Sequence, residues 1–305
     1  MPSYQRAKER ENFMKKLLSV VLAFLMGLAL VGCSSSSSSD DSSSKDTTND
    51  YNLVTEGKLT VAMSTDFAPM EFVDLTKSGQ EKYVGSDVEL AKFIADKLGL
   101  ELEIKAMDFD ACQTAVSSKI VDISISGYSY TTERAASYLL SEDYFAEGDS
   151  GQVAVITVAN KDVYKDLASL NVAGVDVAAQ NGALQQEIVE EQLPNATLKA
   201  IDDLNSAYDS LKAGTYAAVV VAKSVAETLV ASDASFTIVE EQFDDSKYTG
   251  YHALIEKSNT ALCDAVNAAI KELSDGQYAK WQEEAEALFL SLGDNAAEDI
   301  VPEKE

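Results

Sequence analysis

The sequence predicts an α/β protein made of two lobes, each with a sheet flanked by helices. Short apolar segments of strand type alternate with segments of helical periodicity from Leu59 onward, which is typical of mostly parallel sheets. A second series of such segments begins at Gln152. The chain has 305 residues, of which 46% are hydrophobic, so it can bury an apolar core in each of two lobes.

Residues 1–32 have the features of a secretory signal. Lys15 and Lys16 form a basic region before the apolar run Leu17–Val31. That run is shorter than the roughly 20 residues of a membrane-spanning helix, which favours export over membrane spanning. The polar segment before Met14 suggests that synthesis starts at Met14 instead of the first residue, and this choice stays open.

The signal is followed by a predicted anchor and tether. The motif Leu30–Cys33 resembles the lipobox of bacterial lipoproteins, which implies that Cys33 is lipidated and becomes the new N-terminus. Residues 34–50 are nearly all Ser, Asp and Thr, and such a segment cannot bury a core. We therefore expect residues 33–54 to tether a soluble part to a membrane.

The first α/β series begins with a predicted strand, Leu59–Ser64. The helix that follows the loop 65–70 keeps its apolar residues at helical spacing as far as Leu98. Asp87 or Ser86 is expected to cap this helix, and Gly99 to end it. The series continues with a strand over Leu102–Ala106, a short helix over Asp110–Val116 and a strand over Val121–Ile125.

A candidate anion site follows the last of these strands. Ser126, Gly127 and Ser129 are small and polar, so their hydroxyl and N–H groups are free at the carboxyl end of a strand, where α/β sheets bind ligands. Arg134 begins a helical turn, and its planar fork of donors suits a carboxylate. The segment therefore predicts a seat for a small carboxylate. A surface arginine beside a serine-rich turn is the alternative.

The second series repeats the pattern and contains another candidate anion site. Gln180–Ala183 lead into a helix through Leu193, and the free N–H groups at its start favour an anion. Ala217–Val221 is almost wholly apolar and is predicted to be a central strand. The remaining predicted elements are strands Gln152–Ala159, Val175–Ala179 and Tyr251–Ile255, a helix over Ser206–Ala213, and two helices from about Thr260.

Several motifs in this order resemble the solute-binding proteins of bacterial polar amino-acid ABC transporters, which share a periplasmic-binding-protein fold. The resemblance covers about residues 55–290. It rests on Thr65–Phe72, Val84–Ala91, Met107–Asp110, Val121–Arg134, Ala179–Gly182 and Ser274–Tyr278.

The resemblance implies a ligand cleft between two lobes that close about a hinge. The first lobe is then discontinuous and the hinge lies near Gly148 and Gly250. The implied boundaries are 55–148 and 249–292 for the first lobe, 149–248 for the second, and 293–305 for an acidic tail.

The same resemblance implies roles for individual residues. Phe67 and Phe109 are expected to pack on the ligand from either side, although each suits a lobe core equally well. The polar end of the ligand is assigned to Ser126, Gly127 and Ser129, its carboxylate to Arg134, and the second lobe's backbone amides to Gly182 and Ala183.

One departure from the family pattern concerns the ligand's ammonium. Ala222 stands where an aspartate usually pairs with that group, and Ser64 replaces another aspartate of the first loop. A buried ammonium without a carboxylate is costly, so Asp66, Glu71, Asp110 or another acid replaces the missing aspartate. Otherwise the ligand is not a standard α-amino acid.

The net charge of −27 argues against nucleic acid and anionic membrane surfaces as partners. No cofactor or metal is expected, because the sequence has neither a cysteine–histidine cluster nor a phosphate-binding loop. His252 is expected to be a packed strand residue. Whether Cys112 and Cys263 pair stays open.

The sequence therefore predicts a monomeric, lipid-anchored binding protein on the outer face of a bacterial membrane. It captures a small carboxylate solute, in the first place a polar amino acid, and delivers it to ABC permease subunits. A dehydratase-like enzyme of the same fold is the main alternative, although no acid–base pair is evident. A ligand-sensing module is the third, but nothing after Leu292 resembles a span or a signalling domain.

Overall fold

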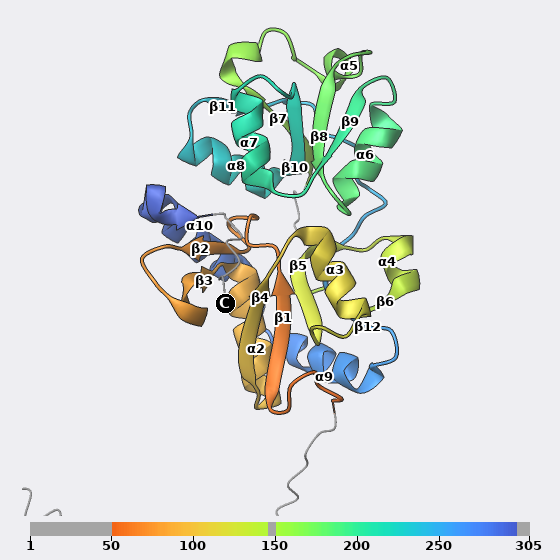
Figure 1. Ribbon diagram of the computed structural model, residues 1–305, viewed down its shortest axis with the longest axis vertical. Coiled ribbons are helices and arrows are strands. Elements are labelled where there is room, and N and C mark those ends of the chain that lie inside the picture. Colours follow the sequence, from red (N-terminus) through yellow and green to blue (C-terminus); the bar gives the residue numbers. More distant parts are fainter. Residues whose placement is uncertain (1–50, 146–150, 298–305) are drawn as a thin grey trace, which may run out of the picture. The chain divides into compact units, whose positions relative to one another are not determined.

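The computed structural model describes residues 51–145 and 151–297. The predicted signal, the lipobox, most of the tether, Gly148 and the end of the acidic tail lie outside these residues. Two five-stranded sheets dominate the fold (Figure 1). The first has the order β4 (Glu101–Ala106), β1 (Lys58–Met63), β5 (Ile123–Ser129), β12 (Tyr251–Glu256), β6 (Tyr138–Leu140). The second has the order β11 (Phe236–Ile238), β7 (Gln152–Thr157), β10 (Ala218–Ala222), β8 (Asp176–Gln180), β9 (Thr197–Ile201).

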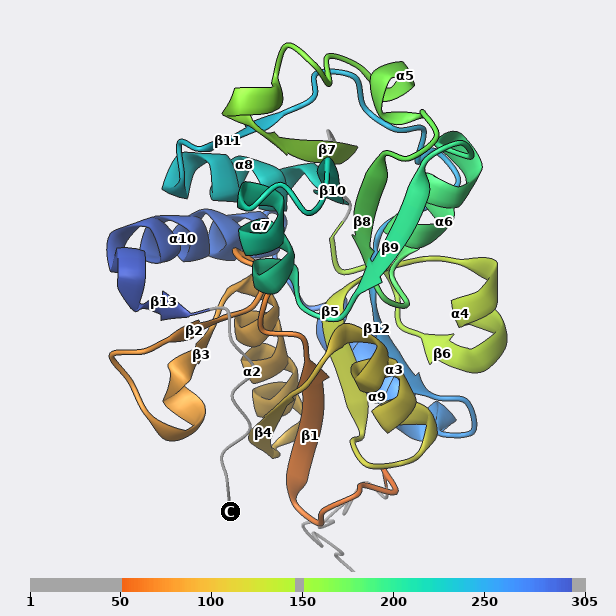
Figure 2. The same cartoon turned by 45° about the horizontal axis from the view of Figure 1, so that its top comes forward.

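Helices flank both sheets, so the predicted α/β class and two-lobe architecture are confirmed (Figure 2). We call the first sheet with its helices the first lobe and the second sheet with its helices the second lobe. The first lobe has α2 (Ser86–Leu98), α3 (Phe109–Ser117), α4 (Thr132–Ser137), α9 (Thr260–Ile270) and α10 (Gln277–Leu292). The second has α5 (Leu167–Leu170), α6 (Leu184–Gln192), α7 (Leu204–Lys212) and α8 (Lys223–Ser232). A small sheet joins β13 (Ala296–Ala297), β2 (Phe72–Asp74) and β3 (Tyr83–Val84).

Each large sheet is parallel over three strands only. β1 is parallel to β4 and β5, and β8 is parallel to β9 and β10. β12 runs antiparallel to both of its neighbours, and so does β7. Because β12 follows β11 in the chain but joins the first sheet, the chain leaves that sheet once and returns to it. The exact lobe boundaries stay a prediction.

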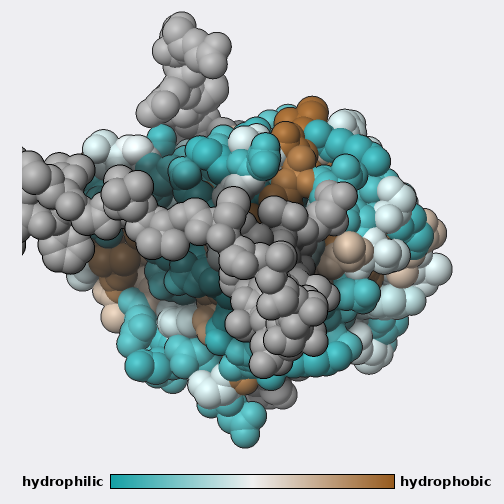
Figure 3. All heavy atoms as spheres, turned by 90° about the horizontal axis from the view of Figure 1, so that it is seen from below, coloured by the Kyte–Doolittle hydropathy of each residue, from teal (hydrophilic) through white to brown (hydrophobic). Residues whose placement is uncertain are grey.

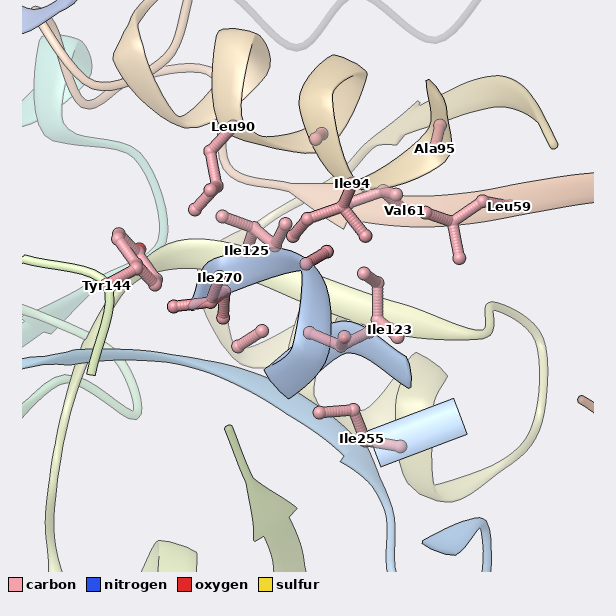
Figure 4. Close-up of a cluster of buried hydrophobic side chains, with 14 of the residues drawn as sticks. Leu59, Val61, Leu90, Ile94, Ala95, Ile123, Ile125, Tyr144, Ile255 and Ile270 are labelled. Carbon is pink, nitrogen blue, oxygen red and sulfur yellow. The ribbon is translucent and has the colours of Figure 1, made fainter. Parts of the chain in front are cut away.

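The core of the first lobe lies between its sheet and helices α2 and α9 (Figure 4). Leu59 and Val61 of β1 face Leu90 and Ile94 of α2, and all four are fully buried. Burial of each such side chain contributes about 1.5–3 kcal/mol, which fixes β1 and α2 relative to each other. The loop that follows β1 therefore starts from a rigid position.

The core of the second lobe covers both faces of its sheet. On β10, Val219 and Val221 join the cluster that packs on α7 and α8, whereas Val220 joins the cluster that packs on α6. All three are buried because β10 is the central strand. The prediction of a central strand at this position is confirmed.

The predicted cap of α2 is wrong. Gly85 is the N-cap, and neither Ser86 nor Asp87 caps the helix with its side chain. A Cβ at Gly85 would lie only 2.0 Å from the carbonyl oxygen of Met70, and its φ of +131° also requires glycine. Gly99 ends the helix in the left-handed conformation, as predicted.

Two further helix starts differ from the predictions by one or two residues. α3 begins at Phe109 instead of Asp110, with Asp108 as its N-cap. α7 begins at Leu204 instead of Ser206, because the Asp203 carboxylate accepts a hydrogen bond from the Ser206 N–H at 2.7 Å. With this start, the Leu204 N–H has no partner within the helix, and it lies at the end of α7 that contacts the first lobe.

Other sequence predictions concern single residues and surfaces. Cys112 and Cys263 are both free thiols, so they do not pair. His252 lies on β12, and its Nδ1 is 2.7 Å from the Ser141 carbonyl oxygen.

The face in Figure 3 is mainly hydrophilic, with small hydrophobic patches. Within 51–145 and 151–297, no helix is long and apolar enough to cross a membrane, and no cluster of acidic, histidine or cysteine side chains could hold a metal.

Candidate functional site

Arg134 lies at a contact between the two lobes. Thr131 caps the short helix α4 by accepting a hydrogen bond from the Arg134 N–H at 3.0 Å, which fixes the start of the helix. The guanidinium donates to the carbonyl oxygen of Ser129 at 2.9 Å and to that of Gly182, in the second lobe, at 3.2 Å. The two predicted anion sites therefore meet at this arginine.

Two aromatic rings support the Arg134 side chain. Its Cζ atom lies 5.3 Å from the centre of the Tyr128 ring and 5.7 Å from that of Phe109, within the range of cation–π contacts. The two rings pack against each other with centres 4.8 Å apart. Arg134 is 5% exposed, and this burial lowers its pKa. In the part of the chain that the structure describes, no carboxylate forms a salt bridge with it, so donors remain for an anionic ligand.

The second-lobe loop presents a carbonyl to Arg134 instead of an amide. The Gly182 N–H donates to the Gln186 side chain at 2.8 Å, and the Ala183 N–H donates to the Gln180 carbonyl at 3.1 Å. A cavity of about 280 Å³ adjoins Arg134, Gly182 and Ala183. That these two amides bind a carboxylate stays a prediction.

Phe67 and Gly127 pack together beside the same contact. Gly127 has a φ of +58°, and a Cβ at this position would lie 2.8 Å from the Phe67 ring. Phe67 also packs against the core cluster of the second lobe that contains Val221 and Ala222. The two predicted ligand-packing aromatics thus occupy different places: Phe67 lies between the lobes, and Phe109 supports Arg134.

The predicted polar residues of β5 are buried and hydrogen bonded. Ser126 accepts from the Ser64 N–H at 3.1 Å and donates to the Glu71 carboxylate. The Gly127 N–H donates to the Asp87 carboxylate at 2.9 Å, so in this structure it is engaged within the first lobe. The carbonyl of Ser129 is engaged by Arg134.

Asp66 connects the two lobes. Its carboxylate accepts from the Ser64 hydroxyl at 2.7 Å and, from the second lobe, from the Gln180 side chain at 2.8 Å and the Leu204 N–H at 2.9 Å. The side chain is 1% exposed, and this burial together with the charge of Asp203 raises its pKa to about 6. The N-terminus of α7 favours an anion here, which explains why the acid is tolerated.

Asp203, whose charge acts on Asp66, also belongs to a group of carboxylates from both lobes around Asp108. Burial raises the pKa of Asp108, and the charges of Asp202, Asp110 and Asp203 raise it further. Asp110 also accepts a hydrogen bond from Asn181 across the lobe contact at 3.1 Å. These acids repel one another, so the site would be stabilised by a cation.

The sequence predicts only that Asp66 or one of several other acids pairs with the ligand's ammonium. It does not predict that Asp66 binds Gln180 and Leu204 of the second lobe. A signal for them was present, because Asp203 three residues before Ser206 is a common capping pattern and places a free N–H at Leu204. Nothing in the sequence indicated that Tyr128 supports Arg134.

Two α/β lobes whose polar groups meet at the carboxyl ends of their strands define a two-lobed ligand-binding protein. The family model of the bacterial extracellular solute-binding proteins, family 3, matches residues 59–285. The chain belongs to this family, as the sequence motifs predicted.

The arginine-binding extracellular protein ArtP of Bacillus subtilis is 30% identical over 268 residues, which are 86% of this chain and 94% of ArtP. The ABC transporter arginine-binding protein 1 of Escherichia coli is 24% identical and covers 73% of this chain and 88% of its own length.

Solved structures are also similar. An amino acid ABC transporter substrate-binding protein of Streptococcus pneumoniae, bound to L-arginine, has a TM-score of 0.69 and 33% identity, and covers 76% of this chain and 94% of its own. The ancestral amino acid-binding protein AncCDT-1, a precursor of cyclohexadienyl dehydratase, has a TM-score of 0.65 and 28% identity, and covers 75% of this chain and 95% of its own.

Proposed function

We propose that this protein binds an amino acid with a cationic side chain, of which L-arginine is the representative, and delivers it to the permease of an ABC importer. Similar proteins named for arginine binding support the proposal, as does a similar structure that holds L-arginine. The observation that carries it is the gathering of carboxylates from both lobes, in which the charge of Asp203 acts on both the buried Asp66 and the half-buried Asp108.

The ligand's two ends suit two parts of the site. The α-carboxylate pairs with Arg134, whose guanidinium has donors left over and is held in position by Phe109 and Tyr128. The side-chain cation lies beside Asp66, which binds groups of both lobes. A ligand of this kind relieves the repulsion among the acids and so favours the closed arrangement of the lobes.

The test is isothermal titration calorimetry with L-arginine and L-citrulline. Citrulline has nearly the same shape, but its side chain is neutral. We expect arginine to bind at least about thirtyfold more tightly, because a buried carboxylate distinguishes a charged partner by 2 kcal/mol or more. Equal affinities, or binding of citrulline alone, would show that the carboxylates do not select the ligand.

We also propose that the protein is exported and held at the outer face of the membrane by lipid on Cys33, as a monomer. The lipobox-like motif at Leu30–Cys33 supports the anchor. Replacement of Cys33 by Ser should move the protein from the membrane fraction to the soluble fraction. A Cys33→Ser protein that still sediments with membranes would contradict the anchor.

We propose binding without catalysis. The similarity to AncCDT-1, described as the precursor of a dehydratase, makes turnover the relevant control. After prolonged incubation with the protein, the bound amino acid should be recovered unchanged by mass spectrometry. A dehydrated product would instead support the hypothesis that the protein is a dehydratase-like enzyme.

A further inference from the structure

Glu71 is a buried acid with an incomplete set of partners. It follows the loop after β1, and its side chain is fully buried. One carboxylate oxygen accepts a hydrogen bond from the Ser126 hydroxyl, whereas the other has no hydrogen-bond partner among the described residues. No salt bridge joins it to a lysine or arginine of 51–145 or 151–297. The ionised form of a carboxyl group buried in this way is costly, and the neighbouring Asp87 favours the protonated form further, so what Glu71 lacks is a cationic partner.

The hydrogen bond to Glu71 determines what Ser126 can offer a ligand. A serine hydroxyl has one proton and two acceptor sites. The proton is used toward Glu71, and one acceptor site is used by the Ser64 N–H at 3.1 Å. What remains is an acceptor, which suits an ammonium group and not a carboxylate.

Ser126 lies between the two charged ends of the proposed site. On one side, Ser64 connects it to Asp66, because the Ser64 hydroxyl donates to Asp66 while the Ser64 N–H donates to Ser126. On the other side, β5 continues from Ser126 to Ser129, whose carbonyl binds Arg134. An amino acid with its carboxylate at Arg134 and its side-chain cation at Asp66 therefore presents its α-ammonium near Ser126.

The second lobe supplies no alternative on its central strand, because Ala222 at the end of β10 is buried and carries no charge. We propose that Glu71 is a positioning residue for the ligand's α-ammonium, which it holds through the Ser126 hydroxyl. This inference rests on the proposed function. It assigns the negative charge that balances the ammonium to the first lobe.

The groups around Glu71 support a linked proton release. Asp87 and Asp66 are the acids that face it, and Tyr128, Tyr144, Tyr278 and Cys112 are the other titratable groups nearby. Burial raises the pKa of Glu71 well above its usual range, and the Asp87 charge raises it further. These surroundings therefore favour the protonated acid when no cation is bound. An arriving ammonium favours the ionised acid, so binding should release a proton and tighten as the pH rises.

The experiment uses titration calorimetry of the purified protein in two buffers that differ in ionisation enthalpy. The ligands are L-arginine and 5-guanidinopentanoate, which lacks only the α-ammonium. The variants are Glu71→Gln, which keeps an acceptor for Ser126, Glu71→Asp, which keeps the charge, and Glu89→Gln, which changes a half-buried glutamate of α2 that pairs with Lys92.

The preference is the ratio of the dissociation constant of the analogue to that of arginine. It should be the same in the wild-type protein and in Glu89→Gln, and at least tenfold smaller in Glu71→Gln. Glu71→Asp should recover part of the preference. Wild-type protein should release more protons with arginine than with the analogue, and Glu71→Gln should not.

An unchanged preference in folded Glu71→Gln would overturn the inference. If that variant does not fold, equal proton release by the wild type with both ligands would overturn it instead. The failure of both ligands to bind the wild type would be a different result, because it would contradict the proposed function itself.

Discussion

Replacement of Asp66 by Asn should stabilise the unliganded protein and weaken its binding of arginine. The pKa of Asp66 is raised from 3.8 to about 6, and a shift of roughly two units corresponds to about 3 kcal/mol lost from stability when the acid is ionised. Because the native pKa lies above the unfolded value, this loss develops as the pH rises from 3.8 to about 6 and is complete above it. Asn carries no charge but has one carbonyl oxygen instead of two, so we expect a gain of about 1–3 kcal/mol at pH 7.5.

The assay is thermal unfolding of both proteins at pH 4 and pH 7.5, with and without L-arginine. Asp66→Asn should melt several degrees higher than the wild type at pH 7.5, with a smaller difference at pH 4. Its affinity for arginine should fall at least about thirtyfold, because the guanidinium loses its carboxylate. A variant that is less stable at pH 7.5 and binds arginine normally would refute both the cost of the buried charge and its role in binding.

Three further predictions follow from the same contacts. Arg134→Ala should weaken binding of all amino acids by at least about 2–3 kcal/mol, measured by calorimetry, and wild-type affinity would place the arginine outside the site. Arginine affinity should fall as the pH drops through about 6, where Asp66 gains its proton, and a flat profile from pH 5 to 7.5 would contradict this assignment. Gly127→Ala should displace the Phe67 ring, which would lie 2.8 Å from the new Cβ, and lower the affinity at least tenfold; unchanged affinity would show that the ring does not contact the ligand.

Much of the fold could be predicted because its signals are local. The wholly apolar run of β10 and the helical spacing of apolar residues in α2 each reflect burial against neighbouring layers. The cap of α2 could not be predicted, since Gly85 is required by the close approach of the Met70 carbonyl, which is distant in the sequence. The sequence also does not show that β12 runs antiparallel to β5 and β6, because both of these strands are distant from it in the sequence.

The candidate site was predicted in part. Arg134 and Gly182 could be proposed from small polar residues after strands, and the structure brings them together. The connection of Asp66 to Gln180 and Leu204 joins segments of different lobes, and only the folded chain shows it. Periodicity likewise does not show that the Ser126 hydroxyl lies beside Glu71.

The most direct test of the central claim is a crystal structure of the protein with L-arginine. We predict that the α-carboxylate lies on the Arg134 guanidinium and that the ligand's guanidinium lies within hydrogen-bonding distance of Asp66. Arginine bound elsewhere, or bound with its guanidinium away from Asp66, would contradict the proposed recognition of a cationic amino acid.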